Sequence, residues 1–432
     1  MKKVRIGVVG GFRGTSMINY CKRAGNAEVV AICDKSPEVL NSQKKNLEGM
    51  DVTYYEKFED FINHDMDAVV LANYANEHAP FAITAMKKGF HVFSEVLPVQ
   101  TMKEAVELIE AVEETGKIYA YGENYCYMPA PYEMHKLYRE GKIGEFEYGE
   151  CEYIHNCESI WPSITYGEED HWRNNMYSTF YCTHSLGPII HITGLRPVSV
   201  TGFEGTKTER NLRTGAKGGQ FGIEMVTLEN GGIVKSIHGG LYNNSIWYSV
   251  YGSKGRMECG REDANDGHID KIYVNFDDFS GDYNLKQEAY KPEPKIEGAL
   301  EGFGHGGSDF YSMYYFVEKI LGNKDADTID VYEAIDMFLP GMFAYRSILA
   351  GGIPMAIPNL RDKAEREKWR NDTACTDPKT AGDMLLPTFS KGTPEIDKGI
   401  YDYVKSLWEK ECSDESTDSY RAAAFNQGSG KK

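Results

Sequence analysis

The strongest constraint on the fold lies in the first 34 residues, where strand, glycine-rich turn, helix and strand follow in close succession. The apolar run at 4–9 predicts a buried strand, and Gly10-Gly11-Phe12-Arg13-Gly14 predicts a turn that opens a helix over 15–24. A second strand over 28–33 ends at Asp34. Parallel neighbouring strands need such a crossover connection, so this β-α-β unit commits the chain to a parallel sheet.

The same alternation continues to about residue 123. Its further strands and helices are expected at 68–73, 77–88, 91–95, 102–115 and 118–122. Alternating strands and helices predict an α/β Rossmann domain with a parallel, doubly wound sheet over residues 1–123.

From residue 124 onward, strands follow one another with little helix between them. Strands are expected at 145–155, 197–205, 220–228, 231–239 and 246–259, and helices near 176–193, 308–321 and 330–349. Gly231-Gly232 predicts a hairpin between two of the strands. This pattern predicts an α+β domain with a mostly antiparallel open sheet over 124–360. A charged, turn-rich and partly irregular C-terminal extension is expected over 361–432.

The composition excludes several kinds of partner. Lys and Arg number 47 against 65 Asp and Glu, a formal charge of −18 that argues against nucleic acid or an anionic membrane. No apolar run approaches the ~18 residues of a transmembrane helix, and no signal peptide is evident. The 9 cysteines are scattered without a CxxC pair, so we expect reduced thiols in a cytoplasmic protein.

The glycine turn and Asp34 together indicate a dinucleotide site. Glycines let the backbone approach a pyrophosphate, the helix N-terminus attracts its charge, and an acid about 20 residues on binds ribose hydroxyls. Asp34 would repel a 2′-phosphate, which favours NAD over NADP. Phe12 stands where a GxGxxG motif has its second glycine, which leaves open which amides hold the pyrophosphate. The alternative is a glycine turn beside an exposed acid in any doubly wound domain.

Other polar residues are expected near the same cleft. Asn73, Asn76 and His78 follow a predicted strand, and loops at the carboxyl ends of parallel strands form ligand sites. Turn chemistry and a helix cap are the alternative for these three. Trp172 and Arg173 are expected to border the nicotinamide or a sugar.

Residues 94–98, Ser-Glu-Val-Leu-Pro, lie where dehydrogenases of the glucose–fructose oxidoreductase and inositol dehydrogenase superfamily carry Glu-Lys-Pro. The layout of the chain resembles that superfamily, although the lysine is replaced by Val96. The resemblance implies a Rossmann domain followed by an α+β domain whose open sheet often packs in oligomers. We therefore expect a homo-oligomer formed through the second-domain sheet.

A narrower resemblance points to the NAD-dependent α-N-acetylgalactosaminidase family, whose motifs occur here in the same order over about 4–358. They are Glu-Val-Leu-Pro at 95–98, Glu123-Asn124-Tyr125, Tyr153-Ile154-His155, Trp172-Arg173, Tyr181-Cys-Thr-His184-Ser-Leu-Gly-Pro188 and Gly304-His305-Gly306-Gly307-Ser308-Asp309. Departures are the shorter glycine turn, Asn156 in place of an aspartate, and the tail after about 361.

This resemblance implies roles for particular residues and implies no metal. The implied active-site residues are Glu123, Tyr153, His155, Tyr181 and His184. The residues predicted to bind NAD, from the turn, the strand ends and the motifs together, are Gly10, Gly11, Phe12, Arg13, Gly14, Asp34, Asn73, Asn76, His78, Glu95, Asn124, Trp172 and Arg173.

The spacing of the Tyr/His pairs supports the assignment independently. Tyr153 and His155 lie two apart on a predicted strand, and Tyr181 and His184 three apart on a predicted helix, so each pair shares a face. Packing residues or a solvated strand face are the alternatives.

The family resemblance implies cleavage of a small-molecule glycoside by transient oxidation at sugar C3, elimination, water addition and re-reduction. An NAD-dependent sugar or polyol dehydrogenase with net oxidation, and a non-catalytic sugar or NAD sensor, remain as alternatives. Neither the sugar, its anomer nor its aglycone is specified by these residues.

Overall fold

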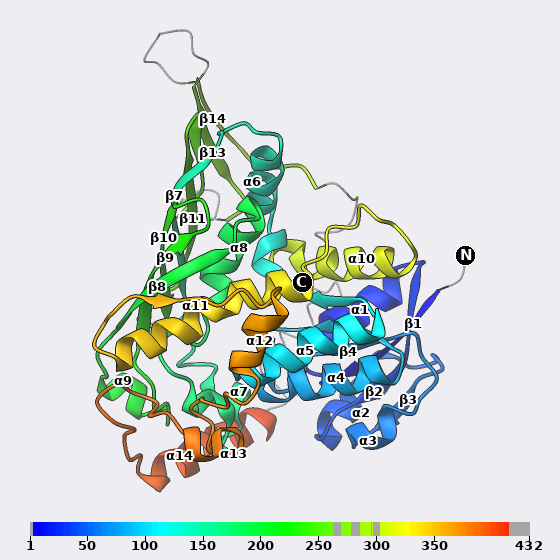
Figure 1. The fold of residues 1–432 in the computed structure, drawn as a ribbon. Coiled ribbons are helices and arrows are strands. Elements are labelled where there is room, and N and C mark those ends of the chain that lie inside the picture. Colours follow the sequence, from blue (N-terminus) through cyan, green and yellow to red (C-terminus); the bar gives the residue numbers. More distant parts are fainter. Residues whose placement is uncertain (1–2, 262–268, 278–285, 295, 297–302, 414–432) are drawn as a thin grey trace.

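The computed structural model describes residues 3–261, 269–277, 286–294, 296 and 303–413. They form two sheets with helices between and around them (Figure 1). Among the described cysteines no disulfide is present. None of the helices in the described ranges is both long and apolar enough to cross a membrane.

The first sheet is fully parallel, with the strand order β3-β2-β1-β4-β5-β6. Its strands are β1 (Val4–Val9), β2 (Ala27–Cys33), β3 (Thr53–Tyr55), β4 (Ala68–Leu71), β5 (His91–Ser94) and β6 (Tyr119–Tyr121). Its helices are α1 (Thr15–Arg23), α2 (Pro37–Asn46), α3 (Phe58–Phe61), α4 (His78–Lys87) and α5 (Met102–Thr115). The predicted parallel, doubly wound Rossmann sheet is confirmed. The strand order reverses between β1 and β4, where ligands bind in such sheets.

The second sheet has the order β14-β13-β12-β11-β7-β10-β9-β8-β15. Its strands are β7 (Phe146–Ile154), β8 (Pro197–Glu204), β9 (Phe221–Leu228), β10 (Ile233–Gly239), β11 (Ser245–Gly252), β12 (Gly255–Cys259), β13 (Ile272–Phe276), β14 (Lys286–Tyr290) and β15 (Met355–Ala356). Only β10 and β7 pair in parallel. The predicted mostly antiparallel sheet and the hairpin at Gly231 are confirmed. The region 246–259 forms two strands, because residues 252–255 make a tight hairpin turn.

One helix, α8 (Thr183–Thr193), is buried along its whole length. It packs against the second sheet, α6 (Pro129–Arg139) and α11 (Val331–Leu349). Pro188 lacks the N–H that would bond to the carbonyl of His184, and the Tyr248 hydroxyl donates to that oxygen instead, at 2.5 Å. A helix interrupted by proline is therefore completed from the neighbouring sheet.

The helix expected near 176–193 begins at Thr183, because residues 178–182 form turns before it. Tyr181 therefore precedes the helix, and the prediction that it shares a helical face with His184 is wrong in detail. The two rings nevertheless lie close, with centroids 5.1 Å apart.

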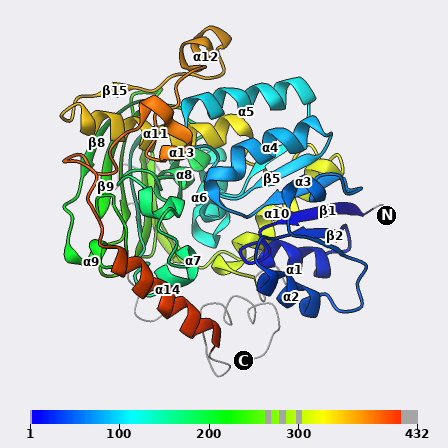
Figure 2. The same cartoon turned by 90° about the horizontal axis from the view of Figure 1, so that it is seen from below.

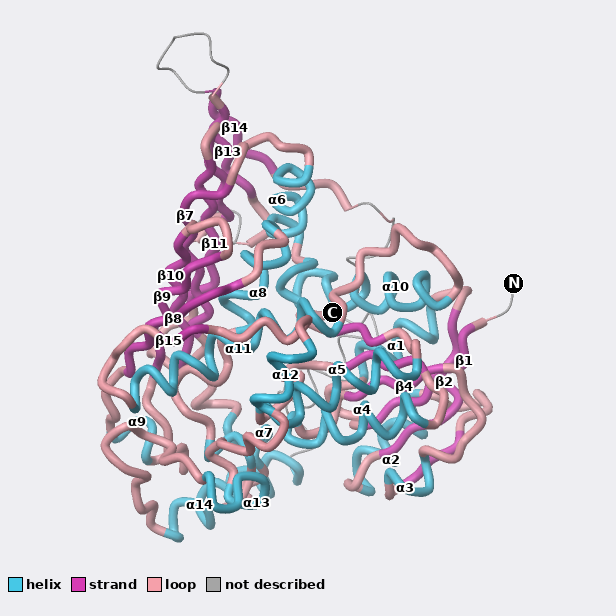
Figure 3. Tube along the Cα trace, viewed as in Figure 1, coloured by secondary structure: helices cyan, strands magenta, loops and turns pink. Residues whose placement is uncertain are grey.

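Helices cover one side of the second sheet, where α6 and α8 lie (Figure 3). Large apolar side chains on several of its strands are partly open to solvent, including Phe203, Ile233 and Tyr251. Assembly of copies through this sheet stays a prediction. The remaining helices of the domain are α7 (Trp161–Thr165), α9 (Glu209–Leu212) and α10 (Ser308–Ile320).

The described part of the extension, residues 362–413, contains three α-helices, α12 (Lys363–Trp369), α13 (Pro378–Ala381) and α14 (Lys398–Ser413). Asp362 and Asp377 cap the first two through their side chains. Helix α12 packs on α5 of the first domain, and α14 runs along the underside of the molecule beside α7 (Figure 2). The extension thus contacts both domains.

Two arginines attach the extension to α5, and they differ in burial. Arg366 is 1% exposed and binds Glu113 through two nitrogens, at 2.9 and 2.5 Å. Arg370 binds Glu110 in the same bidentate way, at 2.9 and 2.7 Å, but both side chains are over a third exposed. The hydrogen bonds from Arg366 lower the pKa of Glu113 to about 2.

We expect Glu113→Gln to lower the free energy of unfolding by about 2–3 kcal/mol at neutral pH, because it leaves a buried guanidinium without its counter-charge. The matched change Glu110→Gln should cost less than about 1 kcal/mol. A carboxylate with a depressed folded-state pKa stabilises above its unfolded pKa and loses that contribution as pH falls. Wild type and Glu113→Gln should therefore converge between about pH 4.5 and pH 2 in urea unfolding. A constant gap across that range contradicts the assignment.

Candidate active site

A cavity of about 1160 Å³ joins the carboxyl edge of the first sheet to the end of the second. Residues from the ends of β1, β2, β4 and β5 line one part of it, and residues from β7, β10 and the turn before α8 line the other. The predicted residues among its lining are Gly10, Phe12, Arg13, Asp34, Asn73, Glu95, Asn124, Tyr153, His155, Trp172, Arg173, Tyr181 and His184.

The glycine turn has the tight backbone that a bound pyrophosphate requires. Gly10 has φ +87°, and a Cβ there would overlap the carbonyl of Ala72. A Cβ at Gly14 would overlap the carbonyl oxygen of Gly10. Gln43 is fully buried and donates to the carbonyl of Gly11 at 2.8 Å, which holds the turn in place. The backbone is so closely packed at Gly10 and Gly14 that only glycine fits, which is typical of a turn that binds a dinucleotide at the N-terminus of a helix such as α1.

Several amides of the turn already donate within the protein. Gly10 donates to the carbonyl of Cys33, Gly14 to that of Gly10, and Thr15 to that of Phe12. The Gly11 amide donates to the Asp34 carboxylate at 2.8 Å, and the Ser36 amide donates to its other oxygen at the same distance. Asp34 is thereby fixed at the cavity wall, with acceptor capacity on both oxygens for ribose hydroxyls.

Arg13 lies between two buried carboxylates from distant parts of the chain. Its guanidinium donates to both oxygens of Asp309, at 3.0 Å each, and to Glu95 at 2.6 Å. Asn124 and His305 also contact Asp309, at 3.2 and 3.3 Å. Burial favours the neutral form of each acid, but the Arg13 and His305 charges hold the pKa of Asp309 well below its ordinary value, whereas that of Glu95 is raised. Asp309 is therefore the carboxylate that stays ionised, and Glu95 is the weaker acid of the two.

His184 is oriented by a carboxylate from the other domain. Its Nδ1 lies 2.6 Å from Oε1 of Glu123, which is fully buried and does not line the cavity. A carboxylate that accepts from Nδ1 directs the opposite ring nitrogen away from itself, toward the cavity that His184 lines. Glu123 therefore lies where a positioning residue is needed, and His184 where a proton-transfer group is needed.

Aromatic rings surround His184. Tyr153 and Tyr125 lie with ring centroids 4.7 and 4.5 Å from it. The Tyr153 hydroxyl is 2.9 Å from Nδ1 of His155, as expected for two residues on one strand face. Burial lowers the pKa of His155 to about 4 and raises that of Tyr153 well above 10, so this pair is neutral near pH 7. The structure thus brings both Tyr/His pairs into one cluster.

Other predicted residues lie outside the cavity lining. His78 is buried and its Nδ1 bonds to the carbonyl of Leu97 at 3.0 Å, so it packs beneath the segment that carries Glu95. The Asn76 carbonyl accepts from Gln100. Gly11 and Gly14 belong to the glycine turn but are not among the residues that line the cavity. Asn73 does reach the cavity, with its side-chain nitrogen on Glu77.

His238 and Trp408 are among the lining residues that the sequence did not suggest. His238 is buried on β10, in register with Tyr153 of the parallel neighbour β7, and neither ring nitrogen has a partner among the described residues. Trp408 reaches the cavity from α14, with its ring 5.1 Å from that of Tyr166. Both positions depend on contacts between distant segments, and only the alternation of β10 could have suggested His238.

Comparison with known proteins agrees with this geometry. Residues 4–123 match the oxidoreductase family with an NAD-binding Rossmann fold, and residues 269–370 match the C-terminal domain of glycosyl hydrolase 109. A glycosyl hydrolase family 109 protein of Solibacter usitatus is 26% identical over 404 residues, covering 85% of this chain and 89% of the relative. An α-N-acetylgalactosaminidase of Tannerella forsythia is 26% identical over 412 residues, covering 83% and 86%.

Solved structures share the fold. Levoglucosan dehydrogenase in complex with NADH and L-sorbose has a TM-score of 0.68 and 17% identity, covering 83% of this chain and 100% of its own. A myo-inositol 2-dehydrogenase from Lactobacillus plantarum has a TM-score of 0.64 and 20% identity, covering 82% and 100%. The sequence matches confirm the resemblance to the oxidoreductase superfamily and its glycosyl hydrolase 109 branch, and the chain is an enzyme, a glycoside hydrolase or a sugar dehydrogenase.

Asp34 generates a direct test of the cofactor site. Asp34→Ala should weaken NAD binding by ~1–3 kcal/mol, because charge-assisted hydrogen bonds to the ribose are lost. Asp34→Asn keeps an acceptor for Gly11 and should mainly relax discrimination against NADP. Titration calorimetry measures both, with the exposed Asp51→Ala as control. If Asp34→Ala bound NAD as tightly as the wild type does, Asp34 would not be part of the NAD site.

Proposed function

We propose that this enzyme is an NAD-dependent glycosidase that cleaves its substrate through transient oxidation at sugar C3, with no net redox change. The observation that carries the proposal is the shared cavity, in which a dinucleotide turn faces two Tyr/His pairs. Val96 in place of the dehydrogenase lysine adds support, because the proton of the oxidised hydroxyl must then be handled by other groups.

The cofactor part of the cavity fits NAD. Gly10 and Gly14 allow the tight turn at the N-terminus of α1, and Asp34 offers oxygens to the ribose. Trp172 and Arg173 stack with 4.4 Å between the guanidinium carbon and the indole, at the border between the turn and the Tyr/His cluster. When bound, NAD supplies a reversible hydride acceptor for C3 of the sugar.

The protein's own groups move the protons. A ketone at C3 acidifies the proton on C2, and a base must remove it as the bond from C1 to the aglycone oxygen breaks. We assign that proton transfer to His184, with Tyr181 beside it, because Glu123 fixes the ring orientation. The departing oxygen takes a proton, water then adds at C1 as a proton returns to C2, and hydride returns to C3. The sum is hydrolysis.

The second pair has a different task. His155 is neutral near pH 7, and the Tyr153 hydroxyl shares a hydrogen bond with it, so the pair can accept and return the proton of a substrate hydroxyl. Two groups with separate proton affinities suit a route in which two protons leave and return. This differs from hydrolysis by two carboxylates, and NAD-dependent glycosidases are exceptions to that route.

A sugar or polyol dehydrogenase is the second candidate. It is favoured by the match of residues 4–123 to the oxidoreductase family. Net oxidation would release NADH to solution, whereas the proposed glycosidase would not.

His184→Ala should lower turnover by ~10²–10⁴-fold, the usual loss when general acid–base catalysis is removed, with NAD binding retained. Glu123→Gln should lower kcat and also shift the pH–rate profile, because Glu123 acts through His184. His64→Gln, whose side chain lies outside the cavity, is the control. Near-normal turnover of folded His184→Ala would show that His184 is a packing residue and not a proton-transfer group.

The proposed function itself is tested by turnover of a panel of aryl glycosides in heavy water. Deuterium should appear at C2 of the released sugar, because that proton is removed and returned, and no NADH should accumulate. Steady accumulation of NADH with an oxidised sugar supports the dehydrogenase. Hydrolysis without deuterium at C2 contradicts the proposed route.

A further inference from the structure

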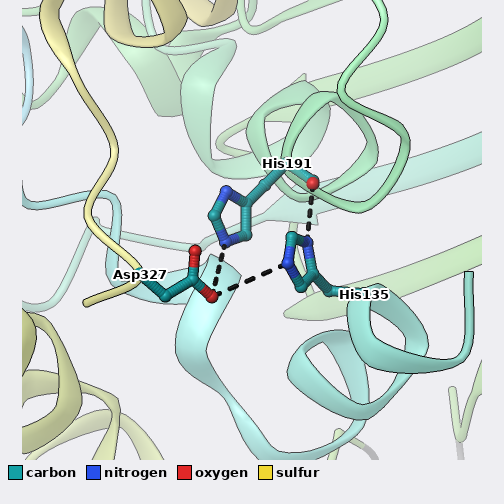
Figure 4. Close-up of side chains that lie close together, drawn as sticks. All are labelled: His135, His191 and Asp327. Carbon is teal, nitrogen blue, oxygen red and sulfur yellow. Dashed lines mark hydrogen bonds and ion pairs between the residues drawn. The ribbon is translucent and has the colours of Figure 1, made fainter. Parts of the chain in front are cut away.

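A second cluster of ligand-type side chains lies apart from the active-site cavity. His135 on α6, His191 on α8 and Asp327 in the segment before α11 converge, as Figure 4 shows. Oδ2 of Asp327 lies 3.6 Å from Nε2 of His135 and 3.7 Å from Nε2 of His191. The three ligand atoms all lie within 4.8 Å of one another. No spacing motif joins these three positions in the sequence.

The other nitrogen of each ring is fixed by an acceptor. Nδ1 of His135 lies 2.7 Å from the carbonyl oxygen of His191, and a carbonyl only accepts, so Nδ1 carries the proton. Nδ1 of His191 lies 2.6 Å from Oε1 of Glu333, which likewise accepts. Nε2 of each ring therefore faces the same carboxylate oxygen, Oδ2 of Asp327.

Two histidine nitrogens and one carboxylate oxygen thus converge on one small space. Nε2 of His191 is buried in a side chain only 3% exposed and has no hydrogen-bond partner among the described residues. The rings of His135 and His191 stack with centroids 4.3 Å apart, so both nitrogens stay on one side. The cluster thus offers two nitrogens and one oxygen to a common ion.

We propose that His135, His191 and Asp327 bind a divalent transition-metal ion of the zinc class. Two nitrogen or oxygen ligands each ~2.0–2.1 Å from zinc lie ~3.3 Å apart at a tetrahedral angle. The observed 3.6 and 3.7 Å are close to that separation. Asp327 is 28% exposed, so water can complete the coordination.

The surroundings of the cluster match those of metal-bound histidines. Such histidines donate their remaining N–H to a carboxylate or a backbone carbonyl, which fixes the ring and raises its basicity. The Glu333 carboxylate accepts the N–H of His191, and the backbone carbonyl of His191 accepts the N–H of His135. These contacts are independent of the three ligand atoms.

The proposed metal joins two helices and the segment before α11 rather than reaching the substrate. None of the three ligands is among the described residues that line the active-site cavity. The ion would connect α6 to the last turn of α8, the helix whose first turn carries His184. Tyr127, in the 3-10 turn after Glu123, donates to the carbonyl of Asp327 at 2.8 Å. The site would therefore stabilise the frame that holds Glu123 and His184.

The test uses the full chain, stripped with a chelator, dialysed, and titrated with zinc chloride. Elemental analysis should find one zinc retained per chain. A hundredfold excess of zinc over its Kd should raise Tm by about 3 °C, from mass-action linkage and the usual unfolding entropy per residue. Cobalt(II) in place of zinc should give the visible absorption of a low-coordinate nitrogen and oxygen site.

Variants separate this site from adventitious binding. Asp327→Asn and His135→Gln should each abolish retained zinc and the rise in Tm, and Glu333→Gln should weaken zinc binding ~10–100-fold. His64→Gln, a histidine outside the cluster, should bind zinc as the wild type does. The cobalt spectrum of the wild type keeps the test decisive if a variant does not fold. No zinc retained by the wild type, or equal zinc binding by folded Asp327→Asn, would overturn the proposal.

Discussion

The hydrogen bond between Glu123 and His184 is the contact on which the site depends. Glu123 follows the last strand of the parallel sheet, and His184 lies in the first turn of the buried helix of the second domain. Their approach is so close that a Cβ at Gly187 would stand 3.0 Å from Cγ of Glu123. The helix must therefore be placed accurately, and the Tyr248 hydroxyl that compensates for Pro188 contributes to that placement.

A second polar contact between distant segments lies at the wall of the same cavity. Arg13 of the glycine turn binds Asp309 at the start of α10, 296 residues later, and also Glu95. A guanidinium shared by two buried carboxylates is costly to separate, because either partner alone would leave an uncompensated buried charge. The two contacts thus hold the cofactor turn and the Tyr/His cluster in one cavity, as a reaction between a cofactor and a sugar requires.

Local patterns in the sequence sufficed for the parallel sheet, for the glycine turn with Asp34, and for the Tyr153–His155 pair on one strand face. Those features depend on neighbours along the chain. The start of α8 was misplaced because residues 178–182 form turns rather than helix. Trp408, Gln43 and the cluster of His135, His191 and Asp327 were missed, because each owes its position to packing between segments far apart in sequence. The role of Arg13 as an ion-pair partner of Asp309 was hidden for the same reason.

The central claim is that cleavage passes through oxidation at C3 of the sugar. The most direct measurement compares the cleavage rate of a glycoside substrate with that of its analogue lacking only the C3 hydroxyl. Binding of the analogue is verified by inhibition of the parent reaction. The account predicts that the 3-deoxy glycoside binds and is not cleaved, because no ketone can form to acidify the C2 proton. Cleavage of the 3-deoxy glycoside at a rate near that of the parent would contradict it.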